Sequence, residues 1–411
     1  MSEFLTLLPP NDALNILLTN LAPANPIKEK VSVECALGRI IAEDLLSPES
    51  LPAFDRSTVD GYAVFASDTF GASESLPAYL TLSIEIPMGR PAQVRLKPRF
   101  AAPIHTGGML PPGADAVVML ENTQVTGTGD LEILRPAAPL DNILLAGEDV
   151  QPGQLIMSQG TLIRPEEVGG LCALGIQSIL CFSRPQIGIL SSGDEVIPAD
   201  QTPLPGQVRD INSYTLGALV EKYGGIPTRF GIIPDLEEVF RTRLRVVMDQ
   251  SDCVIITAGS SASTRDLTAK VIQQMGMPGV LVHGVNIKPG KPTILAICDG
   301  IPVIGLPGNP VSALVIARLF VIPIIQKLSG LKQSPISASI SATLSINLPS
   351  QAGREDWIPV KLISTPTGWG AEPIFYKSNL IFSMVQADGL VQIPSASNGL
   401  PAGEVVDVVF L

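Results

Sequence analysis

The feature that most constrains the fold is an alternation of apolar strands, short loops and helical segments between Arg184 and Leu328. Apolar runs such as QIGIL, CVIIT and PVIGL each lead into a short loop, and a segment with helical apolar spacing follows. Strands that alternate with helices build a doubly wound, mainly parallel sheet that is covered by helices. We therefore predict a central α/β domain over residues 185–329.

The regions on either side of this alternation have different patterns. Residues 52–140 hold short β-rich runs between Gly/Pro turns, which predicts a β-rich insertion domain. Residues 330–411 return to short apolar runs between turns and predict a C-terminal β-barrel domain. Residues 1–51 and 141–184 contain helical spacing at 11–22, 31–44 and 164–174, so we assign them to one discontinuous helical linker domain. The predicted fold class is multi-domain α/β.

The composition of the 411 residues argues against several classes of protein. Lys and Arg number 27 against 39 Asp and Glu, a net charge of −12, so a nucleic-acid partner is not expected. The most apolar stretch contains Arg318 and Pro323, which predicts a buried helix and no membrane partner. The N-terminus lacks a basic, cleavable leader pattern, so we expect a cytoplasmic protein. Five scattered cysteines and two histidines disfavour a disulfide framework and a His-rich metal site.

Gly/Ser-rich loops follow several of the predicted strands. They are Ser191-Ser192-Gly193, Ala258-Gly259-Ser260-Ser261 and Pro307-Gly308-Asn309-Pro310. Ligands of open α/β sheets bind at the carboxyl ends of strands, where backbone N–H groups and helix N-termini favour an anion. One such loop more often serves only to turn the chain, but three in one domain predict an anionic ligand.

Two carboxylates, Glu195 and Asp266, come shortly after two of these loops. A Mg²⁺ ion between them would suit a phosphate-bearing ligand, because Mg²⁺ prefers a few carboxylates together with phosphate oxygens. The alternative is that each acid caps a helix. For Asp266 both interpretations remain open.

The segment HGVNIKPGKP places Lys288 and Lys291 on either side of a Pro-Gly turn. It is not a Walker A loop, because Pro292 stands where Ser or Thr is required. Two lysines held by such a turn could clamp an oxyanion, although a solvated pair is the simpler interpretation. The chain has no GxSxG or SxxK nucleophile motif, so an enzyme of this kind would depend on a metal ion and charged side chains.

Several longer segments, in a fixed order, cover nearly the whole chain: FDRSTVDGYAV, IHTGGMLPPGADAVV, ILSSGDEV, GQVRDINSYTLGALVEKYGG, NIKPGKP and IGLPGNPVSAL. Taken together, these segments resemble the molybdopterin molybdenumtransferases, the MoeA and gephyrin E-domain family. The resemblance implies that molybdate is inserted into adenylylated molybdopterin with Mg²⁺ present and AMP released. It also implies a homodimer whose site lies between the α/β domain of one subunit and the insertion domain of the other. The molybdopterin adenylyltransferase and apo-molybdoenzymes would be its partners.

The resemblance assigns roles to individual residues. It implies catalytic roles, with Glu195 and Asp266 as metal ligands, for Asp60, Thr106, Glu195, Asp235, Asp266, Lys288 and Lys291. The Gly/Ser loops supply the expected cofactor-binding residues Ser192, Gly193, Gly259, Ser260, Ser261, Gly308 and Asn309. The resemblance adds Pro307, Pro310, Arg354 and Ser378 to that set.

Two departures from the family pattern leave a second function open. The usual TSGGVSVGxxD loop is here TAGSSASTRD, one residue shorter, and Leu144 stands where many members have a basic residue. Both would suit a paralogue that binds or delivers molybdopterin with little insertion activity. A generic nucleotide-binding α/β protein would not account for the VDGYA and PGNP segments.

Overall fold

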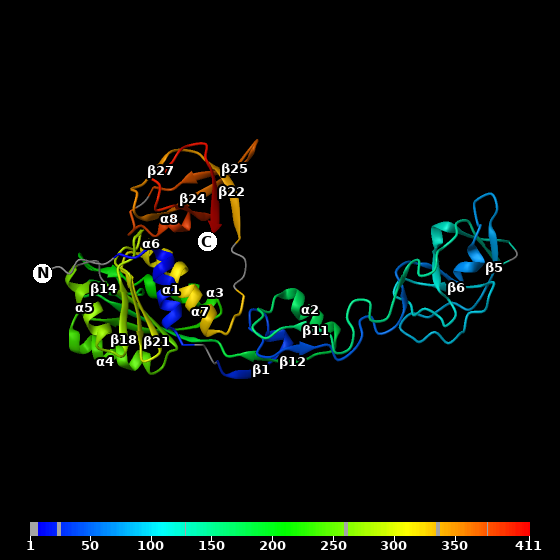
Figure 1. The fold of residues 1–411 in the computed structure, drawn as a ribbon, viewed down its shortest axis with the longest axis horizontal. Helices are drawn as coiled ribbons and strands as arrows, with labels where there is room; N and C mark the ends of the chain where they lie inside the picture. The colour runs from blue at the N-terminus through cyan, green and yellow to red at the C-terminus, as the bar shows by residue number, and fades with distance from the viewer. Residues whose placement is uncertain (1–6, 23–25, 128, 259–261, 334–337, 376) are drawn as a thin grey trace.

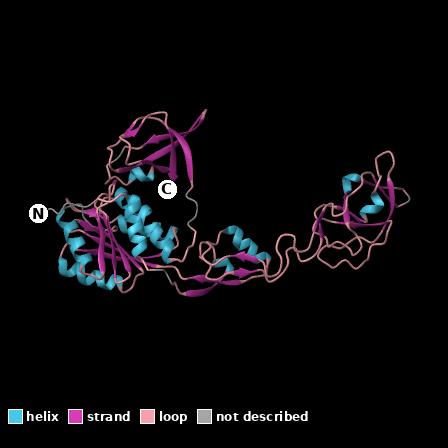
Figure 2. Cartoon of the chain, viewed as in Figure 1, coloured by secondary structure: helices cyan, strands magenta, loops and turns pink. Residues whose placement is uncertain are grey.

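The computed structural model describes residues 7–22, 26–127, 129–258, 262–333, 338–375 and 377–411, with the backbone alone for 262–265. The chain forms an elongated molecule (Figures 1 and 2). An α/β unit and a C-terminal barrel unit lie side by side at one end. A narrow linker leads away from them and carries the β-rich insertion unit at its far end. This arrangement confirms the predicted multi-domain fold class, while the exact domain boundaries stay predictions.

The α/β unit is built on one sheet with the strand order β16-β13-β17-β21-β20-β18. Its strands are β13 (Gln186–Ser192), β16 (Ile226–Ile233), β17 (Cys253–Ala258), β18 (Pro278–His283), β20 (Ile294–Cys298) and β21 (Ile301–Pro307). The pairings from β16 to β21 are parallel, and β20 runs antiparallel to both of its neighbours. The short strands β14 (Val196–Ile197) and β15 (Val208–Arg209) pair beside this sheet.

Helices cover both faces of the sheet, as the alternation predicts. They are α1 (Pro10–Asn20), α3 (Asn212–Lys222), α4 (Glu237–Met248), α5 (Ala262–Gln273), α6 (Pro310–Ile316) and α7 (Ile322–Leu328). Successive strand residues point to opposite faces. Ile187 and Ile189 therefore join a core with Leu216 of α3, while Leu190 joins a second core with Phe240 of α4.

Helix α1 corrects one domain assignment. Ala13, Leu17 and Leu21 are buried in the same core as Ile187 of the central sheet. The helix forms where its spacing predicts it, but it packs on the α/β unit and not on the linker. Sequence spacing shows which face of a helix is apolar, but it does not show which surface that face will cover.

The predicted apolar helix near residue 320 is also present. Helix α6, the π-helical turn η4 (Ala317–Val321) and α7 continue one another. The helix Pro310–Leu328 is long and apolar enough to cross a membrane, but 61% of its most apolar window is buried in the folded chain. It therefore serves as a core helix of the α/β unit, which was the interpretation favoured by Arg318 and Pro323.

The linker is formed mainly by short strand pairs. Its elements are β1 (Lys28–Ser32), η1 (Val33–Cys35), β2 (Leu45–Leu46), β3 (Arg56–Ser57), β10 (Ile143–Leu144), β11 (Leu155–Met157), α2 (Pro165–Ala173) and β12 (Ser178–Phe182). Helix α2 confirms the prediction for 164–174, but the helix predicted over 31–44 is wrong. Val31 and Val33 are buried and Ser32 is exposed, which is the alternating burial of a strand. The apolar spacing of this segment fits a strand as well as a helix.

The insertion unit is a curled β-sheet with the order β7-β4-β6-β5-β9-β8. Its elements are β4 (Gly61–Val64), η2 (Ala66–Thr69), β5 (Ala78–Leu82), β6 (Phe100–Ile104), β7 (Ala116–Met119), η3 (Leu120–Asn122), β8 (Thr123–Val125) and β9 (Asp130–Ile133). Gly61 faces the backbone of β7, and a Cβ there would lie 2.0 Å from the Val118 carbonyl oxygen. A side chain at this position is therefore excluded.

The barrel unit closes through an extra strand pairing. Its elements are β22 (Ser339–Leu344), β23 (Leu348–Pro349), β24 (Glu355–Thr365), β25 (Gly368–Pro373), α8 (Phe382–Val385), β26 (Gly389–Ile393), β27 (Gly399–Leu400) and β28 (Val405–Phe410). Strands follow the order β24-β25-β22-β28-β26, and β26 pairs back onto β24. Strand β19 (Ile287–Lys288), from the α/β unit, adds to β24 in parallel. This pairing joins the two units beside the candidate site.

Candidate functional site

A cavity of about 940 Å³ lies where the α/β unit meets the barrel unit. Its walls are the turn 286–292, the loop after β21, the segment 348–354 and the segment after β25. The cationic side chains that line it are Lys288, Lys291, Arg354 and Lys377. Among the lining residues that the structure describes, none carries a carboxylate. We call this the cationic cavity, and its electrostatic field favours an anion.

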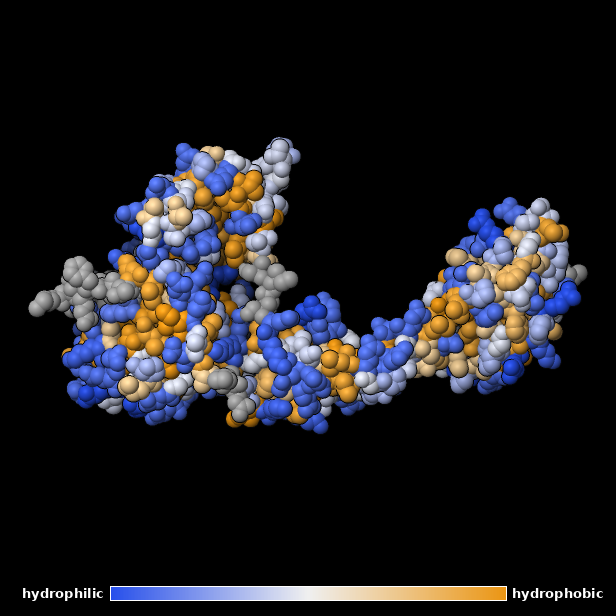
Figure 3. Space-filling model, in the orientation of Figure 1, coloured by the Kyte–Doolittle hydropathy of each residue, from blue (hydrophilic) through white to orange (hydrophobic). Residues whose placement is uncertain are grey.

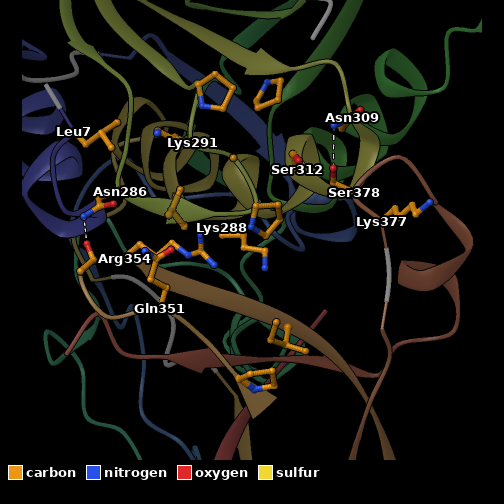
Figure 4. Close-up of a pocket in the computed structure, with 18 of the residues that line it drawn as sticks. Leu7, Asn286, Lys288, Lys291, Asn309, Ser312, Gln351, Arg354, Lys377 and Ser378 are labelled. Atoms are coloured by element: carbon orange, nitrogen blue, oxygen red, sulfur yellow. Dashed lines mark hydrogen bonds between the residues drawn. The ribbon is translucent and has the colours of Figure 1, made fainter. Parts of the chain in front are cut away.

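A buried carboxylate holds two of these cations in place. Asp356 is 1% exposed, and it accepts hydrogen bonds from Arg354, with Nε–Oδ1 at 2.9 Å and Nη2–Oδ2 at 3.4 Å. Lys288 Nζ lies 4.0 Å from Oδ2 of the same carboxylate. Figure 4 shows Lys288 and Arg354 next to one another on one side of the cavity, with Lys377 apart from them. Asp356 is not among the residues predicted from the sequence, although GREDWIPV places two acids at the start of an apolar run.

The predicted lysine turn is tightly packed. Gly290, between the two lysines, has φ +112°, and a Cβ there would lie 2.3 Å from atoms of the Ile316 side chain on α6. Only glycine fits, so the turn is fixed against the helix. Lys288 is exposed over 59% of its side chain and Lys291 is also exposed, which leaves both ammonium groups accessible to a ligand.

The loop after β21 joins this cavity to a smaller one. Asn309 Nδ2 donates to Ser378 Oγ at 2.9 Å, and Figure 4 shows this bond at the edge of the cationic cavity. Asn212 Nδ2 donates to the Gly308 carbonyl at 2.7 Å. Because Asn309 lines both cavities, the predicted residues Pro307, Gly308, Pro310 and Ser378 lie along one continuous surface.

The smaller cavity, of about 270 Å³, lies at the carboxyl ends of β13, β17 and β21. Its walls include Ser191, Ser192, Glu195, Asp210, Asn212, Thr257 and Gly308. This is the edge of the sheet at which a ligand is expected. Gly193 lies beside it, in the turn that leads to the exposed Glu195.

A buried hydrogen-bond network supports the floor of the small cavity. Ser191 Oγ donates to Asp210 Oδ2 at 2.9 Å, and Thr257 Oγ1 donates to Ser191 Oγ at 3.2 Å. Asp210 Oδ1 accepts from the backbone N–H of Ser213 in the first turn of α3, at 3.1 Å. Asp210 is not among the site residues predicted from the sequence, although its segment GQVRDINSYTLGALVEKYGG resembles the family. Its position just ahead of a helix start was the available signal.

Asp235 also reaches this edge of the sheet. Ser192 Oγ donates to Asp235 Oδ1 at 2.5 Å, and the Asp235 backbone N–H donates to Asp194 Oδ1 at 3.3 Å. These bonds tie the loop after β13 to the loop after β16. The prediction that Ser192 and Asp235 meet at one site is therefore consistent with the geometry.

Glu195 and Asp266 are not helix caps. Helix α5 begins at Ala262, four residues before Asp266, so Asp266 lies one turn inside the helix and is exposed. Glu195 lies in the turn between β13 and β14, away from a helix start.

No group of three His, Cys, Asp or Glu side chains is arranged to hold a metal within the described part of the chain. Gly259, Ser260 and Ser261 lie outside the described residues.

Asp60 and Thr106 lie together in the insertion unit, which is far from the α/β unit of the same chain (Figure 1). Asp60 Oδ1 accepts from the Thr106 backbone N–H at 2.8 Å and from Thr106 Oγ1 at 3.3 Å. The backbone hydrogen bond is the main reason that the pKa of Asp60 is lowered. Within one chain, the predicted site residues therefore form two separate groups.

Family models match almost all of the chain. The MoeA N-terminal region (domain I and II) matches residues 8–175, a probable molybdopterin binding domain matches 188–327, and the MoeA C-terminal region (domain IV) matches 341–411. Relatives match over most of their length as well. A molybdopterin molybdenumtransferase of Haemophilus influenzae is 33% identical over 384 residues, 92% of this chain and 93% of the relative. The chain belongs to the MoeA family of molybdopterin molybdenumtransferases.

Other MoeA-family relatives agree with this assignment. A putative molybdopterin biosynthesis protein of Methanocaldococcus jannaschii is 35% identical over 396 residues, 94% of this chain and 92% of that protein. A crystal structure of a molybdopterin biosynthesis MoeA protein from Pyrococcus horikoshii has a TM-score of 0.85 at 32% identity. It covers 99% of this chain and 100% of that chain. The MoeA family resemblance inferred from the sequence is confirmed.

Proposed function

We propose that this protein is the molybdenum insertase of molybdenum-cofactor biosynthesis. It takes adenylylated molybdopterin and molybdate as substrates, inserts the metal and releases AMP. The cationic cavity carries this proposal, because both substrates are anions and its described lining offers lysine and arginine without a carboxylate. The small cavity adjoins it through Asn309, which would let one ligand reach both.

The chain's own residues have distinct tasks in this proposal. Lys288, Lys291 and Arg354 bind an oxyanion, and the buried Asp356 orients Arg354 toward it. Charge-assisted hydrogen bonds of this kind are stronger than neutral ones, and the guanidinium offers two parallel donors. Ser192 and Asp210 fix the loops at the sheet edge where the organic part of the substrate binds.

The carboxylates that are present would bind Mg²⁺ only together with the phosphate groups of the substrate. Glu195 and Asp266 are exposed carboxylates, and no three acidic, Cys or His groups come together for a metal in the described part of the chain. Mg²⁺ usually keeps several waters and takes one or two carboxylates together with substrate phosphates. Glu195 and Asp266 would supply those carboxylates, and the ion would neutralise the charge of a pyrophosphate group.

The working assembly in this proposal is a homodimer in the cytoplasm. Asp60 and Thr106 lie far from the cavities of their own chain, so a second copy would bring them to the site (Figure 1). Exposed apolar side chains along the linker and its ends also suit a second copy. They include Leu46, Phe54, Leu140, Leu145 and Leu155, and Figure 3 shows hydrophobic surface on the linker and on the inner end of the insertion unit. The molybdopterin adenylyltransferase and apo-molybdoenzymes would supply the substrate and accept the product.

The test is anaerobic incubation with adenylylated molybdopterin, Mg²⁺ and molybdate. We expect AMP release and reconstitution of an apo-molybdoenzyme, both lost when molybdate is omitted. The second candidate, a paralogue that binds or delivers molybdopterin, is favoured by the shortened TAGSSASTRD segment and by Leu144. Tight binding of the adenylylated substrate without AMP release would support that candidate and refute insertion.

A further inference from the structure

The ring of His105 lies between two carboxylates in the insertion unit. Its Nε2 is 3.0 Å from Glu85 Oε1, and its Nδ1 is 3.5 Å from Asp60 Oδ1. Glu85 belongs to the segment between β5 and β6, His105 follows β6, and Asp60 directly precedes β4. Asp60 and His105 flank the Gly61–Ile104 pair of the β4–β6 ladder, and the Ile86 N–H donates to the Pro103 carbonyl, so the backbone brings these three side chains to one place. A lone surface histidine would not need two acidic neighbours.

Asp60 is held by these contacts on one of its two oxygens. Thr106 donates to Oδ1 through its backbone N–H and its hydroxyl, and His105 approaches the same oxygen. Each contact to this carboxylate in the described structure reaches Oδ1. These contacts hold Oδ1 in place, and no hydrogen bond or ion pair from the described residues reaches Oδ2, so this oxygen is free to accept from a ligand.

We propose that His105 is a positioning residue for Asp60, and that its imidazolium links Asp60 to Glu85 and fixes the carboxylate for the reaction. The proposal rests on the proposed function, in which Asp60 takes part in catalysis. His105 contacts neither substrate in this proposal and acts only through Asp60. The side chains of His105, Asp60 and Glu85 are 55%, 55% and 62% exposed, so an approaching subunit can reach the cluster.

The charge on the ring decides whether the link exists. The neutral ring has one N–H and no charge, whereas the imidazolium has an N–H on the side of each carboxylate and attracts both, with a hydrogen bond to Glu85 and an ion pair to Asp60. The charged groups that face the ring are Glu85 and Asp60, on separate segments. The hydrogen bond to Glu85 is the main reason that the pKa of His105 is raised, and the charges of Glu85 and Asp60 raise it further.

The direction of the pH dependence follows from this. A raised pKa means that the link is fully present below the ordinary histidine pKa of about 6.5 and is lost as the pH rises through the raised value. Asp60 stays ionised across that range, since its own pKa is lowered. Catalysis that depends on the link should therefore decrease on the alkaline side of the His105 titration.

The first arm of the test is an NMR titration, which needs no substrate. The chain has two histidines, His105 and His283, so the imidazole resonances can be assigned with one variant, His105→Gln. We expect His105 to titrate above the ordinary value, and Glu85→Gln and Asp60→Asn each to lower its pKa. A His105 pKa at or below the ordinary value, or one unmoved by Glu85→Gln, would overturn the link even if AMP release is normal.

The second arm measures AMP release against pH. His105→Gln should lower kcat about tenfold or more, because misplacing a reacting group is costly, and should leave KM nearly unchanged. It should also remove the decrease that coincides with the His105 titration, while the control His283→Gln keeps the wild-type profile. A His105→Gln profile identical to the wild type would refute the positioning role. Wild-type protein without AMP release would refute the proposed function instead, with the NMR result unaffected.

Discussion

Arg354 and Asp356, two residues apart, form a two-point ion pair with Nε–Oδ1 at 2.9 Å and Nη2–Oδ2 at 3.4 Å. The carboxylate is 1% exposed and the guanidinium side chain 32%. The buried acid therefore holds the arginine at the wall of the cationic cavity, and Lys288 adds a weaker contact from β19. A ligand that binds there meets cations whose positions are already fixed, which lowers the entropy cost of binding.

Arg354→Ala should destabilise the barrel unit by about 3 kcal/mol, because it leaves a buried carboxylate without its main partner. Both tryptophans of the chain, Trp357 and Trp369, lie in this unit, so their fluorescence during urea unfolding reports on it. The exposed Lys361→Ala on β24 is the matched control and should stay within about 0.5 kcal/mol of wild type. Adding Asp356→Asn to Arg354→Ala should recover part of the loss. An unchanged unfolding curve for Arg354→Ala would show that the pair does not contribute to stability.

Lys288→Ala and Lys291→Ala should each weaken molybdate binding by about tenfold or more, since a charge-assisted contact is worth about 1.5–3 kcal/mol. Both side chains are exposed, so urea unfolding should be almost unchanged. Isothermal titration with molybdate measures the affinity, and Lys361→Ala again serves as the control outside the cavity. If both lysine variants bind molybdate as the wild type does, the cationic cavity is not the oxyanion site.

The fold was largely predictable because period-two and helical patterns are local. The predicted strands of the central sheet and the barrel are present, and the interpretation of residues 310–328 as a core helix is confirmed. The helix over 31–44 failed because Val31 and Val33 satisfy a strand equally well. Helix α1 was placed on the wrong unit because its partner surface is distant in sequence.

The candidate site was only partly predictable for a similar reason. Lys288 meets Asp356 because β19 pairs with β24, a contact between segments of separate units that no local pattern encodes. Asp210 and Asp356 were missed, since an acid in sequence is expected at the surface until its partner is known. The structure does place Ser192, Asp235 and Asn309 at the same edge of the sheet, as expected for loops that follow neighbouring parallel strands.

Asp266→Asn and Glu195→Gln should abolish Mg²⁺-dependent AMP release and leave the melting temperature almost unchanged. Neither acid caps a helix, so neither substitution removes a cap and the stability of the fold should not change. The exposed Asp249→Asn after α4 is the control and should keep full activity. Normal turnover of the Asp266→Asn variant with Mg²⁺ would show that Asp266 does not bind the metal.

Asp210→Asn should destabilise the edge of the α/β sheet by about 1–3 kcal/mol, because an amide cannot accept at both positions that the carboxylate serves. Ser191 and the N-terminus of α3 lose a charged acceptor in this variant. Hydrogen exchange at β13 and α3 measures the local effect, and the exposed Asp200→Asn is the control. Equal protection in Asp210→Asn and wild type would contradict the network's role.

The proposed function depends most on a site that a second subunit completes. Asp60→Ala should disable the insertion unit, and Lys291→Ala should weaken molybdate binding in the cationic cavity about tenfold or more, so each homodimer should be nearly inactive when molybdate is limiting. A heterodimer carrying one variant on each chain, isolated with two different tags, keeps one intact site of two if the sites form across the interface. We expect it to release AMP at about half the wild-type rate. A heterodimer as inactive as both parents, or a stable monomer in light scattering, would contradict the shared site.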